Sequence, residues 1–108
     1  MKFSIVFFNA TVQERLTAWP VGLYASFIRI SEQIVESGPN LGMPYTKAMG
    51  KGLFEIRARG VEGIGRAFFC CVKDHKIVIL HSFIKKTQTT PVKELQIAQK
   101  RMKEVYRD

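Results

Sequence analysis

The sequence predicts a single α+β domain over residues 1–108, in which a small, mostly antiparallel sheet carries helices in the order β-α-α-β-β-β-α. Three observations lead to this prediction. The chain has 108 residues, of which 46% are hydrophobic and four are prolines, and this suits one folded core. Helical spacing of apolar residues marks the stretches before Gly38 and after Pro91. Between them, three β-patterned stretches follow one another with connections too short for crossover helices.

The first expected elements are a buried strand and a short helix. Phe3 to Phe8 is hydrophobic apart from Ser4, which is typical of a strand. Asn9 is a suitable N-cap for a helix that reaches about Ala18. The apolar run is shorter than the core of a secretory leader, and no run approaches the ~18 residues of a membrane helix. We therefore expect neither a leader nor a membrane span.

A second, longer helix is expected to begin at Pro20, which suits the first helical position. Gly38-Pro39 then ends the helix in the usual order of glycine before proline. Residues 38–50 contain three glycines and two prolines and are predicted to be a loop. One broad apolar stripe defines the buried side of the helix: Leu23, Tyr24, Phe27, Ile28, Ile30, Ile34 and Val35.

The second half of the chain predicts an antiparallel meander of three strands. Residues 53–59 alternate, which indicates a half-buried strand, and residues 64–73 are nearly all apolar, which indicates a central strand. A turn at 74–76 leads to another apolar strand over 77–84. In the alternating strand, one face holds Phe54, Ile56 and Ala58 and the other holds Glu55, Arg57 and Arg59.

The last expected element is an amphipathic helix that follows a polar segment over residues 85–90. Thr90 and Pro91 supply a capping residue and a first-position proline. The predicted buried stripe consists of Val92, Leu95, Ala98, Met102, Val105 and Tyr106. The solvated side is basic, with Lys93, Lys100, Arg101, Lys103 and Arg107.

The charge of the chain is concentrated in its second half. The formal net charge is +8, and the residues up to position 46 carry as many acidic as basic side chains. The excess therefore lies entirely in residues 47–108. One-sided basic charge is the electrostatic signature of a polyanion binder, either a nucleic acid or an acidic protein.

Arg66 and His81 interrupt apolar strands and are the first candidates for chemistry. A buried arginine is costly unless it is paired, so Arg66 either forms an ion pair with Glu55 on the neighbouring strand or clamps a phosphate. His81 is either a core histidine or a proton carrier. Lys85 follows at the exit of the same strand. Together with Arg57 these side chains predict a basic depression on the sheet.

The sequence lacks the residues that several common kinds of binding and catalytic site require. The adjacent Cys70 and Cys71 fall on opposite faces of a strand, so they are expected to be buried and inert and to exclude a disulfide framework and a usual zinc site. There is no glycine-rich phosphate loop, dinucleotide fingerprint or nucleophilic serine motif. Carboxylates are too scattered for a two-metal site. Binding alone remains, or cleavage of RNA without metal or cofactor, through attack by its own 2′-hydroxyl.

The second half of the chain resembles a known family. The matching residues are Gly52-Leu53-Phe54-Glu55-Ile56-Arg57, Arg66-Ala67-Phe68-Phe69 and the string from Ile77 to Pro91 that contains Leu80-His81-Ser82-Phe83 and Lys85-Lys86-Thr87-Gln88, followed by Glu94, Ala98 and Arg101. They look like the phage-derived Gp49-like/HigB branch of the RelE/ParE toxin superfamily. The resemblance covers about residues 51–103 and implies the RelE-like fold.

The resemblance implies a toxin of a type II toxin–antitoxin system that cuts mRNA, commonly on the ribosome, without metal or other cofactor. The catalytic residues carried over by position are Arg57, Arg66 and Lys86, with Lys85 and His81 as adjacent candidates. The residues expected to bind RNA around them are Arg59, Lys51, Gln88 and Lys93. Two positions depart from the family pattern, because Glu55 and Val92 stand where a basic residue and a tyrosine occur in some members.

Two alternatives stay open beside the nuclease. One is a ParE-like toxin that poisons DNA gyrase without cutting RNA, and the other is a catalytically inactive module that binds DNA or antitoxin. The partners implied are a cognate antitoxin, mRNA and the ribosome, and operator DNA only in complex with the antitoxin. The adjacent cysteines and the expected lack of a leader predict a cytoplasmic protein.

Overall fold

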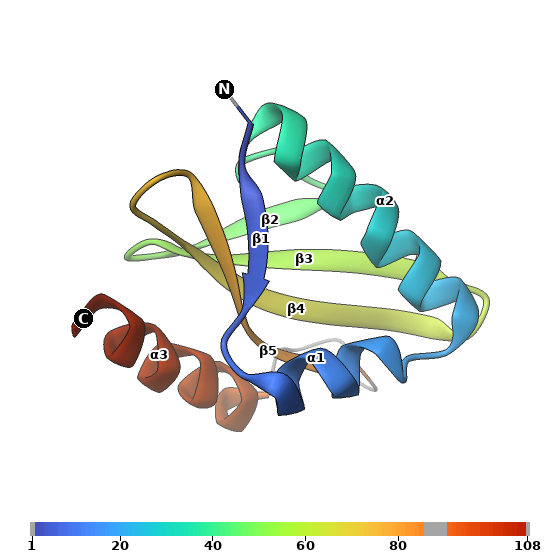
Figure 1. Ribbon diagram of the computed structural model, residues 1–108. Coiled ribbons are helices and arrows are strands. Elements are labelled where there is room, and N and C mark those ends of the chain that lie inside the picture. Colours follow the sequence, from blue (N-terminus) through green and yellow to red (C-terminus); the bar gives the residue numbers. More distant parts are fainter. Residues whose placement is uncertain (1, 86–90, 108) are drawn as a thin grey trace.

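The computed structural model describes residues 2–85 and 91–107 and has the order β-α-α-β-β-β-β-α (Figure 1). The predicted α+β class and the predicted sequence of elements are confirmed, with one strand added. The elements are β1 (Ser4–Phe7), α1 (Ala10–Thr17), α2 (Val21–Ser37), β2 (Thr46–Gly50), β3 (Leu53–Gly60), β4 (Gly63–Val72), β5 (Lys76–Lys85) and α3 (Val92–Arg107).

The added strand, β2, corrects the prediction of a loop over residues 38–50. β2 pairs antiparallel with β3, with Thr46 opposite Ile56 and Ala48 opposite Phe54. Lys51 and Gly52 both have positive φ angles, 54° and 88°, which is the backbone of a tight hairpin turn. Backbone pairing with β3 holds this edge strand, and its residues show no apolar alternation that a sequence could reveal.

The five strands form one sheet in the order β1-β5-β4-β3-β2. β2 to β5 are antiparallel neighbours, whereas β1 lies beside β5 in parallel, with Ile5 opposite Ile77. The sheet is therefore mixed and mostly antiparallel, as predicted. The parallel pairing is possible because two helices and three strands separate β1 from β5 in the chain.

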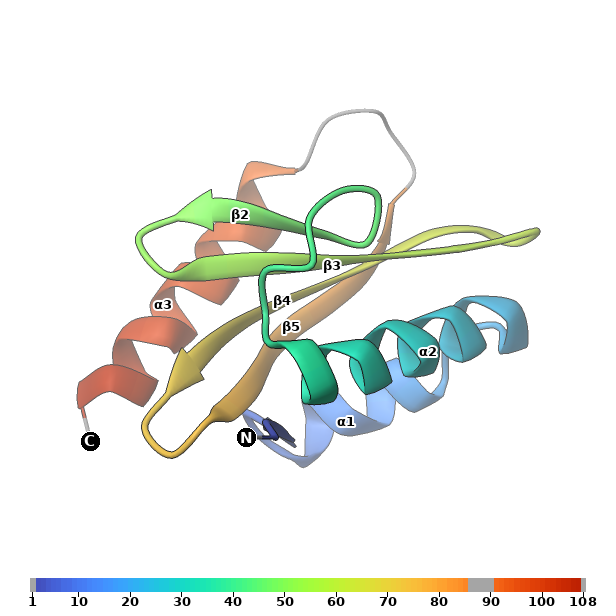
Figure 2. The same cartoon turned by 90° about the horizontal axis from the view of Figure 1, so that it is seen from above.

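The two faces of the sheet each carry a hydrophobic core. Helices α1 and α2 lie on one side and α3 on the other (Figure 2). The first core contains Leu16, Phe27, Ile34, Ile56, Phe69 and Ile79, all buried. The second contains Leu53, Phe68, Cys70, Val78, Leu80, Ala98 and Met102. Burial of both faces explains why β4 and β5 are nearly continuous apolar runs.

The helix ends agree with the sequence signals in part. The Asn9 side chain accepts a hydrogen bond from the backbone of Val12 at 2.9 Å, so the predicted cap is confirmed. Pro20 is the N-cap of α2 and not its first helical residue. The predicted buried stripe of α3 is wrong at its two ends, where Val92 is 67% and Tyr106 is 52% exposed, although the Tyr106 hydroxyl still donates to the carbonyl oxygen of Cys71 on β4 at 2.8 Å. The expected cap at Thr90 lies outside the described residues.

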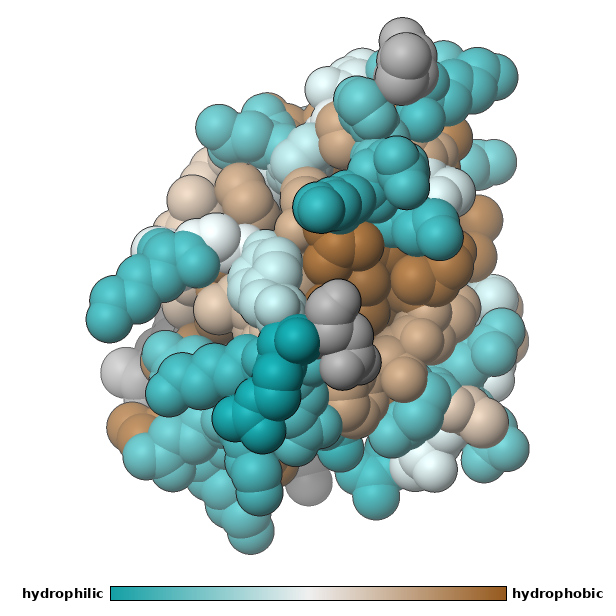
Figure 3. Space-filling model, turned by 60° about the vertical axis from the view of Figure 1, so that its left-hand side comes forward, coloured by the Kyte–Doolittle hydropathy of each residue, from teal (hydrophilic) through white to brown (hydrophobic). Residues whose placement is uncertain are grey.

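The face of the molecule in Figure 3 is mostly hydrophilic, with a smaller hydrophobic area beside the hydrophilic side chains. Over the described residues, no helix is both long enough and apolar enough to cross a membrane.

Candidate functional site

The register of the sheet gathers charged side chains on one face. Arg57 of β3 lies opposite Arg66 of β4, and Lys47 of β2 lies opposite Glu55 of β3. Lys85 ends β5 opposite Ile64, two residues from Arg66. Since paired residues point to the same side of a sheet and side chains alternate along each strand, these side chains share one face. We call Lys47, Glu55, Arg57, Arg66 and Lys85 the basic cluster.

A buried ion pair forms the base of the basic cluster. Arg66 Nη1 donates to Glu55 Oε2 at 3.0 Å, and these side chains are 5% and 0% exposed. The ion-pair interpretation of Arg66 is thus confirmed. The pair spans β3 and β4 diagonally, so it fixes the guanidinium against the sheet. A buried charge pair is costly to break, because removing one partner leaves the other charge without compensation.

The positive charges of the basic cluster act on one another. Partial burial, followed by the charge of Arg66, lowers the pKa of Arg57, although Glu55 opposes this effect. Desolvation and then the charges of Arg66 and Arg57 lower the pKa of Lys85 below 10.5, again against the opposing effect of Glu55. Four cations close to one carboxylate leave a net positive charge that attracts anions, and the lowered pKa makes the neutral form of Lys85 easier to reach than that of an ordinary lysine.

His81 lies on the same face but is engaged with α3. Its Nε2 atom is 3.0 Å from Glu94 Oε2, and the ring is almost completely buried. Along β5, Phe83 lies between His81 and Lys85, and its ring stacks on His81 at 6.3 Å. His81 and Glu94 therefore connect β5 to the first turns of α3. The sequence did not indicate this pairing, because thirteen positions and a polar segment separate the two residues.

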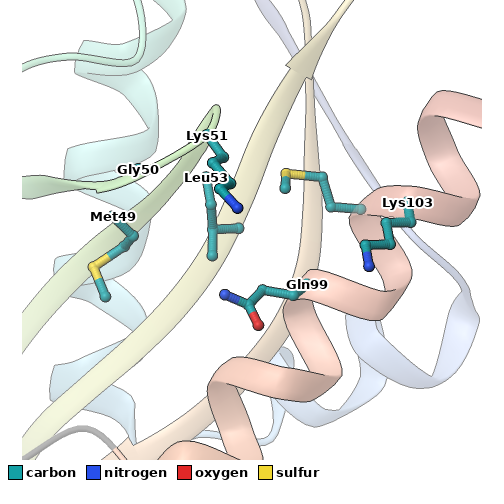
Figure 4. A pocket seen from close by; sticks show the side chains of 7 residues that line it. Met49, Gly50, Lys51, Leu53, Gln99 and Lys103 are labelled. Atoms are coloured by element: carbon teal, nitrogen blue, oxygen red, sulfur yellow. The ribbon is translucent and has the colours of Figure 1, made fainter.

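The remaining predicted residues are only partly brought together. Arg59 lies two residues after Arg57 on the same face of β3 and its charge acts on Arg57, whereas Lys93 is exposed at the start of α3. Lys51 lies in the β2–β3 turn, before the other end of β3, and lines a separate cavity of about 350 Å³ next to α3. Figure 4 shows Lys51 and Gln99 on opposite walls of that cavity. Lys86 and Gln88 lie outside the described residues.

Sequence reasoning missed Lys47, which belongs to the unpredicted strand β2. The only signal for β2 in the sequence is Gly50-Lys51-Gly52, because glycines suit the positive φ angles of a hairpin turn. It also missed the role of Arg101, which had appeared as part of the basic solvated side of α3. Arg101 Nη1 donates to the carbonyl oxygen of Leu80 at 2.7 Å, and the guanidinium lies 5.2 Å from the centre of the Phe8 ring. Arg101 thus attaches α3 to the sheet.

The prediction that both cysteines are buried is confirmed for Cys70 and wrong for Cys71, which is only partly buried. Cys70 packs in the core below α3 and Cys71 is half-buried on the opposite face. Burial raises the pKa of Cys70 to about 11 and also raises that of Cys71. Thiols with a raised pKa are poor nucleophiles at neutral pH. Among residues 2–85 and 91–107, no three His, Cys, Asp or Glu side chains form a group that could hold a metal ion.

Comparisons with known proteins place this chain in a family. A family described as phage-derived protein Gp49-like (DUF891) matches residues 14–103. The structure of the E. coli toxin RelE in the free state, from a mutant in which arginines are replaced by alanine, superposes with a TM-score of 0.64. The two chains share 12% identity over 94% of this chain and 99% of that one.

The archaeal RelE–RelB complex from Pyrococcus horikoshii gives a TM-score of 0.57 and 21% identity over 80% of this chain and 98% of that one. A search of curated protein sequences returns no match. The family match spans most of the chain, and both structures share its arrangement of sheet and helices. The chain belongs to the phage-derived Gp49-like family and has the fold of the RelE toxins.

Proposed function

We propose that this protein is the toxin of a type II toxin–antitoxin system and that it cleaves mRNA as an endoribonuclease, on the ribosome. The observation that carries the proposal is the basic cluster, in which four cations and one carboxylate share one face of a RelE-like sheet. Such a face suits a phosphodiester, whose charge grows in the transition state. Membership of the Gp49-like family and the fold of the RelE toxins support the assignment as a toxin.

In the proposed reaction the RNA supplies its own nucleophile. The 2′-oxygen bonds to the adjacent phosphorus, the bond from phosphorus to the 5′-oxygen breaks, and a 2′,3′-cyclic phosphate and a 5′-hydroxyl result. Lys85, with its lowered pKa, accepts the 2′-hydroxyl proton, and water returns a proton to the 5′-oxygen. Arg57 compensates the charge on the phosphate oxygens. Lys86 stays a predicted contributor.

Arg66 and His81 have positioning roles in this proposal. Arg66 is buried beside Glu55, and its charge adds to desolvation, which is the larger cause, in lowering the pKa of both Arg57 and Lys85. His81 holds the start of α3 through Glu94. If His81 carried the proton instead, its removal would abolish cleavage in a protein that stays folded.

An antitoxin is the proposed protein partner, because one of the similar structures is a complex of RelE with RelB and because this chain carries a net charge of +8. An acidic protein that covers the basic cluster would both bind and inhibit it. Operator DNA would then be bound only through the antitoxin. A toxin that acts on translating ribosomes works in the cytoplasm.

The test is expression of the chain in bacteria with primer extension on cellular mRNA. Lys85→Met is compared with Lys76→Met, which removes the same charge from the exposed start of the same strand. Arg57→Met is compared with Arg15→Met on α1. We expect cuts within translated codons, a loss of about 10²–10⁴-fold for Lys85→Met and of about 10²–10³-fold for Arg57→Met, and little change for either control. His81→Gln is expected to keep most of the activity.

Other outcomes separate the alternatives. Growth arrest with intact mRNA and stabilised gyrase–DNA breaks would replace the nuclease with a ParE-like activity. No growth arrest and no cleavage would leave a binding module. Cleavage of equal rate in Lys85→Met and Lys76→Met would remove Lys85 from the mechanism.

A further inference from the structure

A second cavity opens at the edge of β3, on the side away from α3. Its volume is about 230 Å³, and it lies between α2 and the turn that precedes β2. Figure 2 shows the chain between α2 and β2 crossing over β3. The last β2–β3 pair joins Thr46 to Ile56, and beyond it Arg57 donates its backbone N–H to Tyr45 at 2.9 Å. The cavity therefore occupies the place that a longer β2 would cover.

The cavity is built to receive an anion. Three arginines are among its lining residues, Arg29 of α2 and Arg57 and Arg59 of β3, and none of the described residues in its lining is acidic. Arginine is the side chain best matched to phosphate oxygens, because its planar fork donates two parallel hydrogen bonds. Arg29 and Arg59 are exposed, so both side chains are accessible to a ligand from solvent.

Two further side chains suit a nucleobase. Tyr45 lines the cavity and is 46% exposed, so its ring offers a stacking surface. Gln33 contributes an amide that can both donate to and accept from a base edge. A volume of about 230 Å³ is below the roughly 300–1,000 Å³ of most small-molecule pockets. That size fits one phosphate with a stacked base better than a larger free ligand.

The turn that carries Tyr45 is held in place. The Thr46 hydroxyl accepts a hydrogen bond from the backbone of Gly42 at 2.9 Å, and the Gly42 carbonyl accepts from the backbones of Tyr45 and Thr46 at 3.0 Å. On the other wall, the Ser26 hydroxyl accepts from the backbone of Arg59 at 3.1 Å. A preorganised platform loses little entropy when it binds a base.

Arg57 belongs both to this cavity and to the basic cluster. The two are consequently continuous around the edge of β3. We propose that the cavity is a second nucleotide subsite, which holds the phosphate and base of a nucleotide neighbouring the cleaved bond on the same single strand of RNA. This inference rests on the proposed function, because cleavage defines the bond that the bound nucleotide neighbours. The cavity's affinity for RNA can nevertheless be measured without cleavage.

The test measures binding of a fluorescent, 2′-O-methylated single-stranded RNA, which cannot be cleaved through its 2′-oxygen, by anisotropy at several salt concentrations. Arg29→Ala is compared with Arg15→Ala, an equal change of charge on α1 outside the cavity lining. Arg29→Ala should weaken binding and reduce the slope of log K against log salt by about 0.7, the value for one lost phosphate contact on a single strand. Arg15→Ala should do neither.

The stacking role has its own pair of variants. Tyr45→Ala should weaken RNA binding about 5- to 150-fold, as expected for one lost base–aromatic stack, whereas Tyr45→Phe should retain it. In a cleavage assay, Arg29→Ala should raise KM and leave kcat nearly unchanged, because it removes binding and not chemistry.

Three results would overturn the subsite. Arg29→Ala and Arg15→Ala could bind RNA equally, Tyr45→Ala could bind as well as Tyr45→Phe, or polyglutamate could compete as well as RNA, which would assign the surface to an acidic protein. Failure of the proposed function gives a different pattern. Wild-type protein would then bind RNA through Arg29 and Tyr45 without cutting it on ribosomes.

Discussion

Removal of Arg66 is the most informative perturbation of the fold, because the structure ties this residue to a buried carboxylate. In Arg66→Ala, the Glu55 carboxylate, which is 0% exposed in the wild type, loses the guanidinium that is 3.0 Å away. Breaking a buried pair in this way typically lowers the free energy of unfolding by about 3–5 kcal/mol. That is a large share of the roughly 5–15 kcal/mol that holds a small domain together.

The assay is urea unfolding followed by the fluorescence of Trp19, which is the single tryptophan of the chain, is 8% exposed and packs against Gly65 beside Arg66. When the same fluorescence is followed during heating, the melting temperature should fall by at least about 12 °C, at about 4–8 °C per kcal/mol for a domain of this size. The double variant Glu55→Leu/Arg66→Met removes both charges and should recover most of the lost stability.

Equal stability of Arg66→Ala and wild type would refute the reasoning, since it would mean that the Glu55 charge needs no partner. A double variant no more stable than Arg66→Ala would refute it as well, because packing and not charge would then be the cause. The same measurement decides how loss of activity in Arg66→Ala is interpreted. Only activity lost from a folded protein reports on catalysis.

Three further predictions concern packing, helix attachment and pH. Gly65→Ala should lower the free energy of unfolding by about 1–3 kcal/mol in urea titrations, because the added Cβ would lie 2.6 Å from the Trp19 ring. Glu94→Gln should increase hydrogen exchange of the first amides of α3, where its carboxylate contacts His81, whereas Glu104→Gln on the exposed side of α3 should not. Lys85→Met should raise stability at neutral pH, where the lowered pKa means that the protonated lysine is disfavoured in the folded state. That gain should disappear in unfolding curves measured above pH 10.5, the ordinary lysine value, since the unfolded chain then also loses the proton.

The sequence predicted the elements that have a periodic apolar pattern. Strands β3, β4 and β5 and helix α2 have continuous or regularly spaced apolar residues, and each was placed within a few residues of its bounds. β2 has no such pattern, because one neighbour at the sheet edge stabilises it through its backbone. Lys47, which belongs to β2, was therefore not predicted as part of the site. Local patterning therefore sufficed for every element except the one that depends only on pairing.

The candidate site was predictable only as far as strand alternation reaches. Alternation placed Glu55 and Arg57 on one face, and a hairpin about Asp74-His75 placed Arg66 near Lys85, as the register shows. The partner of His81 could not be found in this way, because Glu94 lies on another element. The cavity at the edge of β3 could not be predicted either, since Arg29 comes from α2 and Tyr45 from a segment without a periodic apolar pattern. Contacts between elements that are distant in sequence need the three-dimensional structure.

The parallel pairing of β1 with β5 has a consequence for how the chain folds during synthesis. Ser4, near the start, lies opposite Lys76, so β1 has no partner strand until most of the chain has been made. Pairing between residues so distant in sequence requires closure of a long loop, which slows folding. Because Lys85 is the last residue of β5, the basic cluster is also completed only then. We expect ribosome-bound chains truncated before β5 to lack the protease resistance of the released protein.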